Sequence, residues 1–248
     1  MRAVFKLLQE IRNAVCHDEL SATLGQMCEL IKFDFFLLAL STPHSITQVE
    51  TLVLDSFPVT WRRHYNVVGL GHFEAIVQYS QKEYLPVIWD DLLHHKKCQR
   101  SYRGIMNNIQ NHGIKNGFSI PIHGIQGKFG IISFATSSIC KSPTPLYTDA
   151  IPLVQLIIPS LQDALQRINL GHSEVKPHKL TKRERECLTW AAEGKSAWEI
   201  SKIISCSERT VIFHLSNSIS KLDATNRYQA ISKALITGVI GPDLTLSP

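Results

Sequence analysis

The 248-residue sequence lacks an apolar run long enough to cross a membrane, and it lacks any closely spaced pair of cysteines. A membrane-spanning helix needs about 18 or more consecutive apolar residues, and no segment reaches that length. The first residues include Arg2, Lys6 and Glu10 and form no signal-peptide core. The six cysteines are scattered without a CxxC motif, which is typical of free thiols in a reducing compartment. The sequence therefore predicts a cytoplasmic protein without a disulfide framework.

Glycine and proline are also sparse. With 13 Gly, 11 Pro and 44% hydrophobic residues, the composition excludes fibrous and low-complexity proteins and is typical of a folded domain. The length accommodates one large domain or two of ordinary size.

The formal net charge of +5 is concentrated near the C-terminus. Residues 176–233 hold eleven Lys and Arg against six Asp and Glu, an excess of five, so the rest of the chain is neutral. A positive excess confined to one short region is typical of a nucleic-acid-binding module.

The hydrophobic pattern predicts a sheet covered by helices, followed by an all-helical tail. Short apolar runs typical of strands occur at 33–41, 49–57 and 84–89, and two more flank a Gly-rich hairpin turn within 117–135. Helical spacing recurs at 3–15, 20–31, 100–112 and 146–168.

Residues 170–179 break this periodicity with Gly, Ser and Pro. We therefore predict an α+β protein of two domains. An α/β/α sandwich with an antiparallel sheet occupies residues 1–170, a linker occupies 171–179, and an all-α domain of four helices occupies 180–248.

Two capping boxes open the first two helices of the predicted C-terminal domain. Thr181 precedes Glu184 by three residues, and Ser196 precedes Glu199 by the same spacing, so each pair can satisfy free N–H groups at a helix start. A sharp turn separates the second helix from a third that begins near Glu208, and a fourth follows. Two short helices joined by such a turn form the helix-turn-helix that places a helix in the DNA major groove.

The third of these helices is the predicted DNA-reading element. Its outward side carries the apolar residues Ile212 and Phe213. Contact with thymine methyl groups would explain why apolar side chains stand on this surface. The residues of this helix expected to contact DNA are Arg209, Thr210, Ile212, Phe213, Ser216 and Asn217. The cations expected to meet phosphates are Lys195, Lys202, Lys221 and Arg227, although each could also belong to an ordinary solvated helix face.

Residues 180–235 closely resemble the C-terminal domain of LuxR-type regulators. They carry Glu184, Leu188 and Gly194 at the signature spacing of that family. We interpret these three residues as structural, because Leu188 would pack in the core and Gly194 would allow a helix end that a side chain would obstruct.

The N-terminal region does not show the alternating strands and helices of a phosphorylated receiver domain. Instead, this region resembles the autoinducer-binding domain of the quorum-sensing branch of this family. The residues that carry the resemblance are Trp61, Tyr65, Trp89, Gly113 and the run GFSIPIH at 117–123. The resemblance therefore spans nearly the whole chain.

This resemblance implies a pocket between the sheet and its helices that holds an N-acyl homoserine lactone. Such a ligand offers two carbonyls, an amide N–H and an acyl tail, so its pocket needs a few fixed polar groups in an apolar lining. By resemblance, Trp89 donates its indole N–H to the lactone carbonyl and Tyr65 its hydroxyl to the acyl side, supplemented by Ser133. The predicted ligand-binding residues are Phe57, Trp61, Tyr65, Glu74, Trp89 and Ser133, of which the aromatic members could instead be core residues.

Three positions depart from the family pattern. Glu74 and Ala75 stand where the family usually has Asp followed by Pro, and Phe57 stands where many members have a tyrosine. Glu74 can still accept from an amide N–H, and because a buried carboxylate without a donor is costly, we expect the ligand to carry a donor there. Phe57 removes a hydroxyl whose hydrogen bond would contribute about 0.5 to 1.5 kcal/mol.

The resemblance also implies how the two domains act together. Ligand completes the N-terminal core and favours a folded homodimer, whose two helix-turn-helix units bind an inverted-repeat site in double-stranded DNA. Dimer contacts are expected from the 146–168 helix and from the fourth C-terminal helix. RNA polymerase is an expected partner of such an activator, and no cofactor is expected besides the autoinducer.

Two other interpretations stay open. One is an enzyme, although no set of catalytic residues stands out. His94 and His95 are adjacent and would point in different directions on a helix or strand, which makes a metal site with Cys98 unfavourable. The glycines near Lys128 lack the spacing of a P-loop. The other is an orphan receptor of the same family that responds to a different small signal, which the departures from the family pattern allow. We therefore predict no catalytic residues and no metal ligands.

Overall fold

The computed structural model describes residues 2–59, 61–62, 74–92, 110–124, 127–138, 144–172 and 180–241. The chain divides into two compact units. The first holds most of a β-sheet and the helices up to His172, and the second holds the helices from Lys182 onward. No helix in the described ranges is long and apolar enough to span a membrane.

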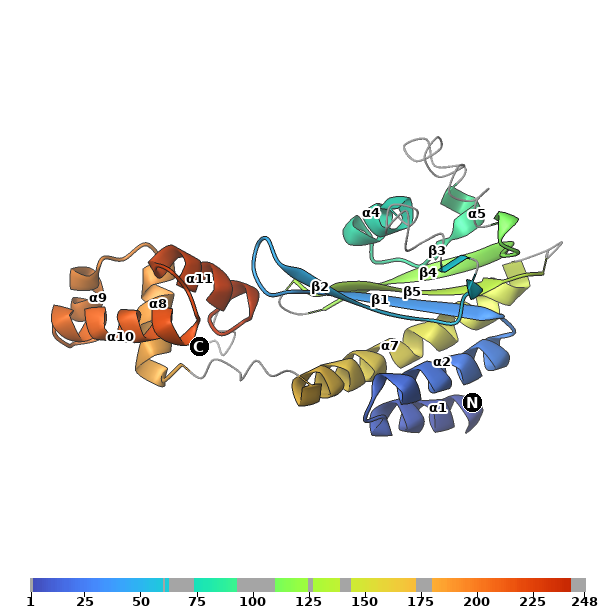
Figure 1. The fold of residues 1–248 in the computed structure, drawn as a ribbon, viewed down its shortest axis with the longest axis horizontal. Coiled ribbons are helices and arrows are strands. Elements are labelled where there is room, and N and C mark those ends of the chain that lie inside the picture. The colour runs from blue at the N-terminus through green and yellow to red at the C-terminus, as the bar shows by residue number, and fades with distance from the viewer. Residues whose placement is uncertain are drawn as a thin grey trace. The chain divides into compact units, whose positions relative to one another are not determined.

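A five-stranded sheet forms the centre of the first unit (Figure 1). The strands lie in the order β2-β1-β5-β4-β3. Their bounds are β1 Phe35–Pro43, β2 Val49–Asp55, β3 Val87–Ile88, β4 Asn116–His123 and β5 Phe129–Thr136. β1 pairs antiparallel with β5, β5 with β4 and β4 with β3, so the predicted hairpin and antiparallel sheet are confirmed.

The main hydrophobic core lies on one face of this sheet. Helices α2 His17–Ile31 and α7 Thr144–His172 lie on that side of the sheet, and α1 Arg2–Asn13 packs against both of them (Figure 1). Successive side chains of a strand point to opposite faces, so only alternate strand residues, such as Phe118 and Ile120 of β4, enter this core.

A second, smaller core lies on the opposite face, which carries helix α4 Glu74–Lys82 and the short helix α5 Trp89–Leu92 (Figure 1). Leu37 and Ala39 of β1 and Ile131 of β5 point to this side. Helices on both faces of an antiparallel sheet make the α/β/α sandwich that the sequence predicts.

Some elements of this unit differ from the sequence-based expectations. The strand expected at 84–89 is reduced to Val87–Ile88, because the chain turns into α5 at Trp89, and α4 was not expected. Helix α7 continues through His172 into the predicted linker, with its two prolines on exposed positions. The helix expected at 100–112 lies outside the described residues except for 110–112.

The second unit consists, over the described residues 180–241, of four helices. They are α8 Lys182–Ala192, α9 Ala197–Ile203, α10 Glu208–Lys221 and α11 Arg227–Ile236. Each follows a side chain that accepts a backbone N–H of the first turn, in order Thr181, Ser196, Ser207 and Asn226. Both predicted capping boxes are formed.

The core of this helical unit draws on every helix. Leu188 of α8, Ile200 of α9, Val211 of α10 and Ala230 of α11 are fully buried. The turn between α9 and α10 passes through Ser205, whose φ of 54° lies in the left-handed region. Helices α9 and α10 with this turn are the predicted helix-turn-helix, and the predicted α+β fold is confirmed.

Candidate functional site

A row of four side chains crosses the second face of the sheet. Leu37 pairs with Ser133, Ser133 with Ser119, and Ser119 with Val87. Residues paired directly across strands point to the same face, so all four lie on the side of the second core. The two central serines are fully buried, which places a polar pair inside an apolar layer.

Hydrogen bonds join these serines to Trp89. The indole Nε1–H of Trp89 donates to Ser119 Oγ at 2.9 Å, and the Oγ atoms of Ser119 and Ser133 are 2.7 Å apart. Two hydroxyls carry two protons, and only one of these can lie between the two oxygens. The other proton meets no acceptor within the described part of the chain. The pair can therefore donate one hydrogen bond to an oxygen of a bound molecule.

Aromatic side chains pack against one another and against the sheet in the rest of this layer. The ring centroid of Phe57 lies 5.7 Å from that of Phe35 and 4.7 Å from that of Trp61. Trp89 packs directly on Gly117, where an added Cβ atom would lie 2.7 Å from its Cζ3 atom. An apolar and aromatic lining with few polar groups is typical of a site for a small organic molecule.

Four of the six predicted ligand-binding residues meet on this face, namely Phe57, Trp61, Trp89 and Ser133. Tyr65 lies outside the described residues. Glu74 begins helix α4, but its side chain lies outside the described part of the structure.

The structure changes the role expected of Trp89. We expected its indole N–H to meet a lactone carbonyl, whereas this N–H, the only donor of the side chain, bonds to Ser119. The reason is that Trp89 directly follows β3, whose residue Val87 pairs with Ser119, so the indole lies against β4. The sequence reasoning missed Ser119. Its alternation with Phe118 and Ile120 could have placed it on the face opposite the main core.

Helix α10 of the second unit buries one side and exposes another. Val211 and Leu215 pack against the other helices, whereas Ile212 and Phe213 are 51% and 60% exposed. Two adjacent large apolar side chains on a water-facing surface indicate a surface that another molecule covers.

The polar residues predicted to contact DNA differ in their exposure. Arg209 and Ser216 are exposed, whereas Thr210 and Asn217 are half-buried. The hydroxyl of Thr210 lies 2.7 Å from that of Ser207, the residue that caps this helix. Thr210 therefore also belongs to the helix start.

Two of the cations expected to meet phosphates have partners within the domain. Lys221 Nζ lies 2.7 and 2.8 Å from the two carboxylate oxygens of Glu184. Arg227 donates to the carbonyl oxygens of Ala191 and Lys195 at the end of α8. These two cations therefore tie α10 and α11 to α8, and this scaffolding role was not expected from the sequence.

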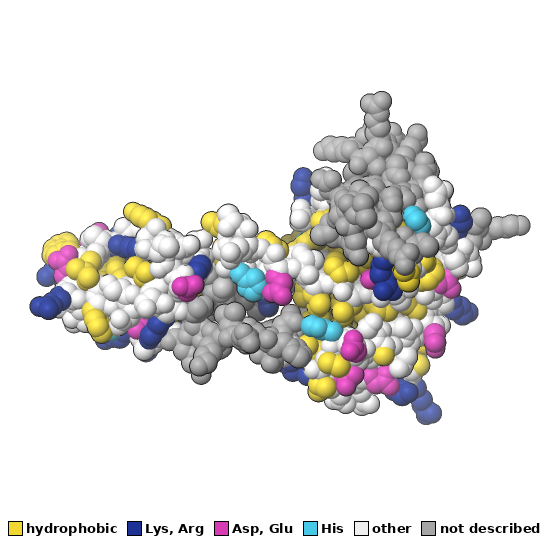
Figure 2. Space-filling view, in the orientation of Figure 1, with side chains coloured by type: hydrophobic (Ala, Val, Ile, Leu, Met, Phe, Trp, Pro, Cys, Tyr) yellow, Lys and Arg dark blue, Asp and Glu magenta, His cyan; other side chains and the backbone are white. Residues whose placement is uncertain are grey.

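The other two predicted phosphate contacts lie at or near α9. Lys195 Nζ is 3.9 Å from a carboxylate oxygen of Glu199, and Lys202 Nζ lies 5.6 Å from the centroid of the Trp198 ring. On the face visible in Figure 2, the Lys and Arg side chains of this domain are scattered among other side chains and form no single patch.

The residues interpreted as structural occupy positions with clear packing or backbone demands. Leu188 is fully buried, and Gly194 has a φ of 82°, which favours glycine. Gly113, one of the residues that carry the resemblance of the N-terminal region, has a φ of 84° and the same preference. Burial opposes ionisation of Glu184, but hydrogen bonds from Lys221 and from Thr181 outweigh it and lower the pKa of this carboxyl.

Family comparison matches both parts of the chain. Residues 17–165 match the family described as "Autoinducer binding domain", and residues 178–234 match "Bacterial regulatory proteins, luxR family". The chain belongs to the LuxR family. It is a LuxR-type quorum-sensing transcription regulator, and because this family consists of DNA-binding regulators, the enzyme interpretation is withdrawn.

Named LuxR-family relatives span almost the entire chain. The transcriptional activator VanR of Vibrio anguillarum is 46% identical over 245 residues, which cover 98% of this chain and 100% of VanR. The transcriptional activator LuxR of Aliivibrio fischeri is 37% identical over 236 residues, which cover 95% and 94% of the two chains. The crystal structure of Escherichia coli SdiA has the same fold, with a TM-score of 0.79 at 24% identity over 96% of this chain and 98% of SdiA.

Proposed function

We propose that this LuxR-family regulator binds an N-acyl homoserine lactone on the second face of its sheet and then binds an inverted-repeat DNA site as a homodimer to activate transcription. The observation that carries this proposal is the Ser119–Ser133 pair, one of whose two hydroxyl protons has no acceptor among the described residues and lies inside an apolar layer. A carbonyl oxygen of the lactone would accept that proton.

The remaining ligand contacts are assigned in part from this face of the sheet and in part from the family resemblance. Phe57 and Trp61 supply apolar walls, and Trp89 orients Ser119 through its indole N–H. Tyr65 donates to the acyl carbonyl and Glu74 accepts from the amide N–H, as the family resemblance implies. Ligand at a hundred times its dissociation constant would stabilise the folded chain by about 2.7 kcal/mol.

We further propose that residues 1–170 form the autoinducer-binding domain and 180–248 the DNA-binding domain, joined by 171–179. Ligand binding in the first domain promotes dimerisation, which fixes the spacing of the two DNA-binding domains. Two helices α10, one from each protomer, then read two half-sites in successive major grooves.

Exposed apolar side chains support dimer contacts on two helices. On α7, Pro152, Leu156 and Pro159 are exposed at spacings of four and three residues and therefore share one side of the helix. On α11, Tyr228 and Leu235 are exposed seven residues apart. Burying both stripes against a second copy would remove them from water.

The DNA contacts are proposed from the exposed side of α10. Ile212 and Phe213 would meet thymine methyl groups, with Arg209, Ser216 and Asn217 on base edges or phosphates. Lys195 and Lys202 would meet the phosphate backbone. RNA polymerase is the proposed partner for activation once the dimer is on its site.

The test is to produce the full chain with and without a panel of acyl homoserine lactones. Mass spectrometry of the purified protein should detect a bound lactone, and the liganded protein should retain an inverted-repeat promoter fragment more strongly at low than at high salt. DNA retention that is equally strong without lactone, or a protein that carries no lactone from any member of the panel, would contradict the proposal.

A second candidate is a receptor of the same fold for a different small signal. Phe57 favours it, because its ring contacts Phe35 and Trp61 and offers no hydroxyl to an acyl carbonyl. The same mass spectrometry separates the two candidates, since it identifies whatever molecule remains bound.

A further inference from the structure

Helix α4 carries a buried hydroxyl that has no partner among the residues that the structure describes. Ser80 is fully buried, and its Oγ forms no hydrogen bond within the described part of the chain. A serine inside a helix commonly donates to a carbonyl of the preceding turn, as Ser218 does to His214 and Ser201 to Trp198. Ser80 makes no such bond, so its hydroxyl is available to a bound molecule.

Ser80 belongs to the layer that holds the serine pair. It lies one helical turn after Ile76, which is fully buried in the second core, and residues four apart share one side of a helix. Helix α4 packs against β4 and β5, the two strands that carry Ser119 and Ser133. Hydroxyl groups with unused hydrogen-bonding capacity therefore occur on both walls of this layer, the helix and the sheet.

We propose that Ser80 is a further ligand-contacting residue that favours acyl homoserine lactones with an oxygen substituent on the acyl chain near the amide. This inference rests on the proposed function, in which the Ser119–Ser133 pair and Tyr65 already serve the two carbonyls. Ser80 is then left for a third oxygen. A hydroxyl can donate to a keto oxygen and can donate to or accept from another hydroxyl, whereas a methylene group offers it nothing.

The chemistry gives Ser80 a selective role rather than a general one. A site that holds an unpaired buried hydroxyl rejects a ligand without a partner for it, because the hydroxyl then stays unsatisfied in the complex. The net gain from one neutral hydrogen bond corresponds to about a three- to tenfold difference in affinity.

The test uses the full chain and three probes of equal length: N-octanoyl, N-(3-oxooctanoyl) and N-(3-hydroxyoctanoyl) homoserine lactone. Dissociation constants are measured from the ligand-dependent rise of the unfolding temperature. Of the 3-oxo and 3-hydroxy lactones, the one with the higher affinity should bind the wild-type chain about three- to tenfold more tightly than the octanoyl lactone. In Ser80→Ala this ratio should fall to about one, and Ser80→Thr, which keeps a hydroxyl, should retain part of it.

Thr23→Val is the matched control, since it removes a buried hydroxyl from α2, where Thr23 bonds to the Glu19 carbonyl. It should change stability but leave the ratio between lactones unchanged. If Ser80→Ala does not fold, Ser80→Cys takes its place with the same expected order, because a thiol is a weak donor.

Equal wild-type affinities for the three lactones, or a preference that persists in Ser80→Ala, would overturn the assignment of Ser80 while binding itself still supported the proposed function. If the wild-type chain binds none of the three probes, nor any other lactone of the panel, the proposed function fails and this inference fails with it.

Discussion

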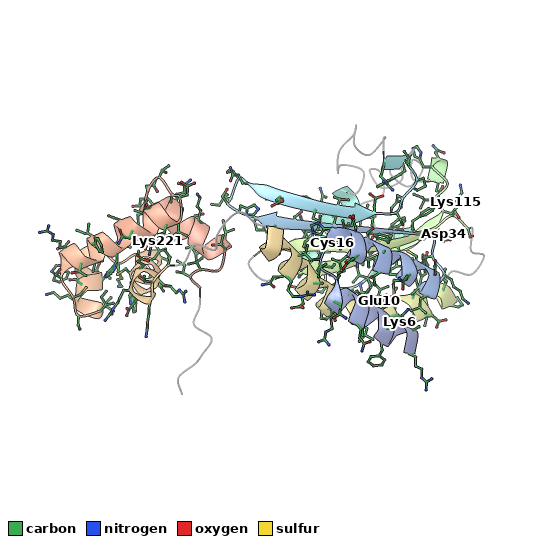
Figure 3. All side chains as sticks on the ribbon, turned by 60° about the horizontal axis from the view of Figure 1, so that its bottom comes forward. Lys6, Glu10, Cys16, Asp34, Lys115 and Lys221 are labelled. Carbon is green, nitrogen blue, oxygen red and sulfur yellow. The ribbon has the colours of Figure 1, made fainter. Side chains whose placement is uncertain are left out.

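Lys221, on the last turn of α10, lies with its Nζ 2.7 Å from a carboxylate oxygen of Glu184, on the first turn of α8 (Lys221 is labelled in Figure 3). The glutamate side chain is 3% exposed and that of the lysine 40%. The same carboxylate accepts the backbone N–H of Thr181 at 2.7 Å. One buried carboxylate therefore closes the start of α8 and fixes the end of the helix proposed to read DNA.

Replacing Lys221 with methionine should lower the free energy of unfolding of the C-terminal domain by about 1 to 3 kcal/mol, because a buried carboxylate loses its cation. The exposure of the lysine keeps this cost below that of a fully buried pair. Urea unfolding measures the change. Lys182→Met, at an exposed position at the start of α8, is the control and should be nearly neutral. Equal losses in the two variants would show that the ion pair contributes nothing specific.

The lowered pKa of Glu184 gives the stability of this domain a defined pH dependence. Burial opposes ionisation, but hydrogen bonds from Lys221 and Thr181 prevail, so the folded state favours the carboxylate. The resulting stability is present above the unfolded pKa of about 4.3 and is lost as the pH falls through the lower folded pKa. Unfolding free energies measured between pH 3 and 6 should converge for wild type and Glu184→Gln at the acid end. A constant difference over this range would contradict the prediction.

The features of this domain that the sequence predicted are those that depend on residues close together in the chain. Capping boxes such as Thr181 with Glu184 join residues three apart, so the sequence alone predicts where α8 and α9 begin. The bond from Lys221 to Glu184 spans 37 residues and depends on how the helices pack, which no local pattern reports. We therefore expected Lys221 to meet a phosphate, and its partner is a carboxylate.

The same distinction between local and long-range interactions applies to the second face of the sheet, where the ligand is proposed to bind. The hairpin and its turn were predicted because strand alternation and a Gly-rich turn are local signals. Helix α4 was not, because among its described side chains, those of residues 76–82, only Ile76 and Ser80 are buried, which gives no broad apolar stripe. Whether the proton of a serine has an acceptor depends on tertiary neighbours, so the roles of Ser119 and Ser80 emerge only from the structure.

Ser119 and Ser133 should differ in what they contribute to stability. Ser119→Ala removes the hydroxyl that accepts the buried N–H of Trp89 and should cost about 1 to 3 kcal/mol, whereas Ser133→Ala keeps that bond and should cost less. Trp89→Phe removes the donor of the same bond, so the double variant Ser119→Ala with Trp89→Phe should lose less than the sum of the two single losses. Strict additivity in thermal unfolding would contradict a role for the indole bond.

The exposed apolar pair on α10 should matter for DNA and not for folding. Phe213→Ala removes a side chain that is 60% exposed, so the unfolding temperature should hardly change, whereas specific DNA affinity should fall by about 1 to 3 kcal/mol. Val211→Ala, at a fully buried position of the same helix, is the contrasting variant, and its main effect should be a lower unfolding temperature. Gel-shift titrations on specific and unrelated DNA provide the measurement. An unchanged specificity ratio in Phe213→Ala would remove this residue from the reading surface.

Gly117 should tolerate no side chain, because its Cα lies against the Trp89 indole. An added Cβ would lie 2.7 Å from Cζ3 of that ring and 2.8 Å from the carbonyl oxygen of Phe134. The carbonyl belongs to β5, which pairs with β4 at this position, so it cannot retreat without disturbing the sheet. The indole must therefore shift, and its 2.9 Å bond to Ser119 is lost.

Gly117→Ala should consequently lower stability by about 1 to 3 kcal/mol and weaken the response to lactone, because Ser119 loses the group that orients it. Near-ultraviolet circular dichroism reports the Trp89 environment, and thermal unfolding reports the stability. Gly25→Ala in α2 is the matched control. A Cβ there meets nothing within 4 Å, so this change should stabilise the helix by about 0.4 to 1 kcal/mol. If Gly117→Ala kept both the wild-type spectrum and the wild-type unfolding temperature, the indole would not be held against β4, and the orientation of Ser119 would need another cause.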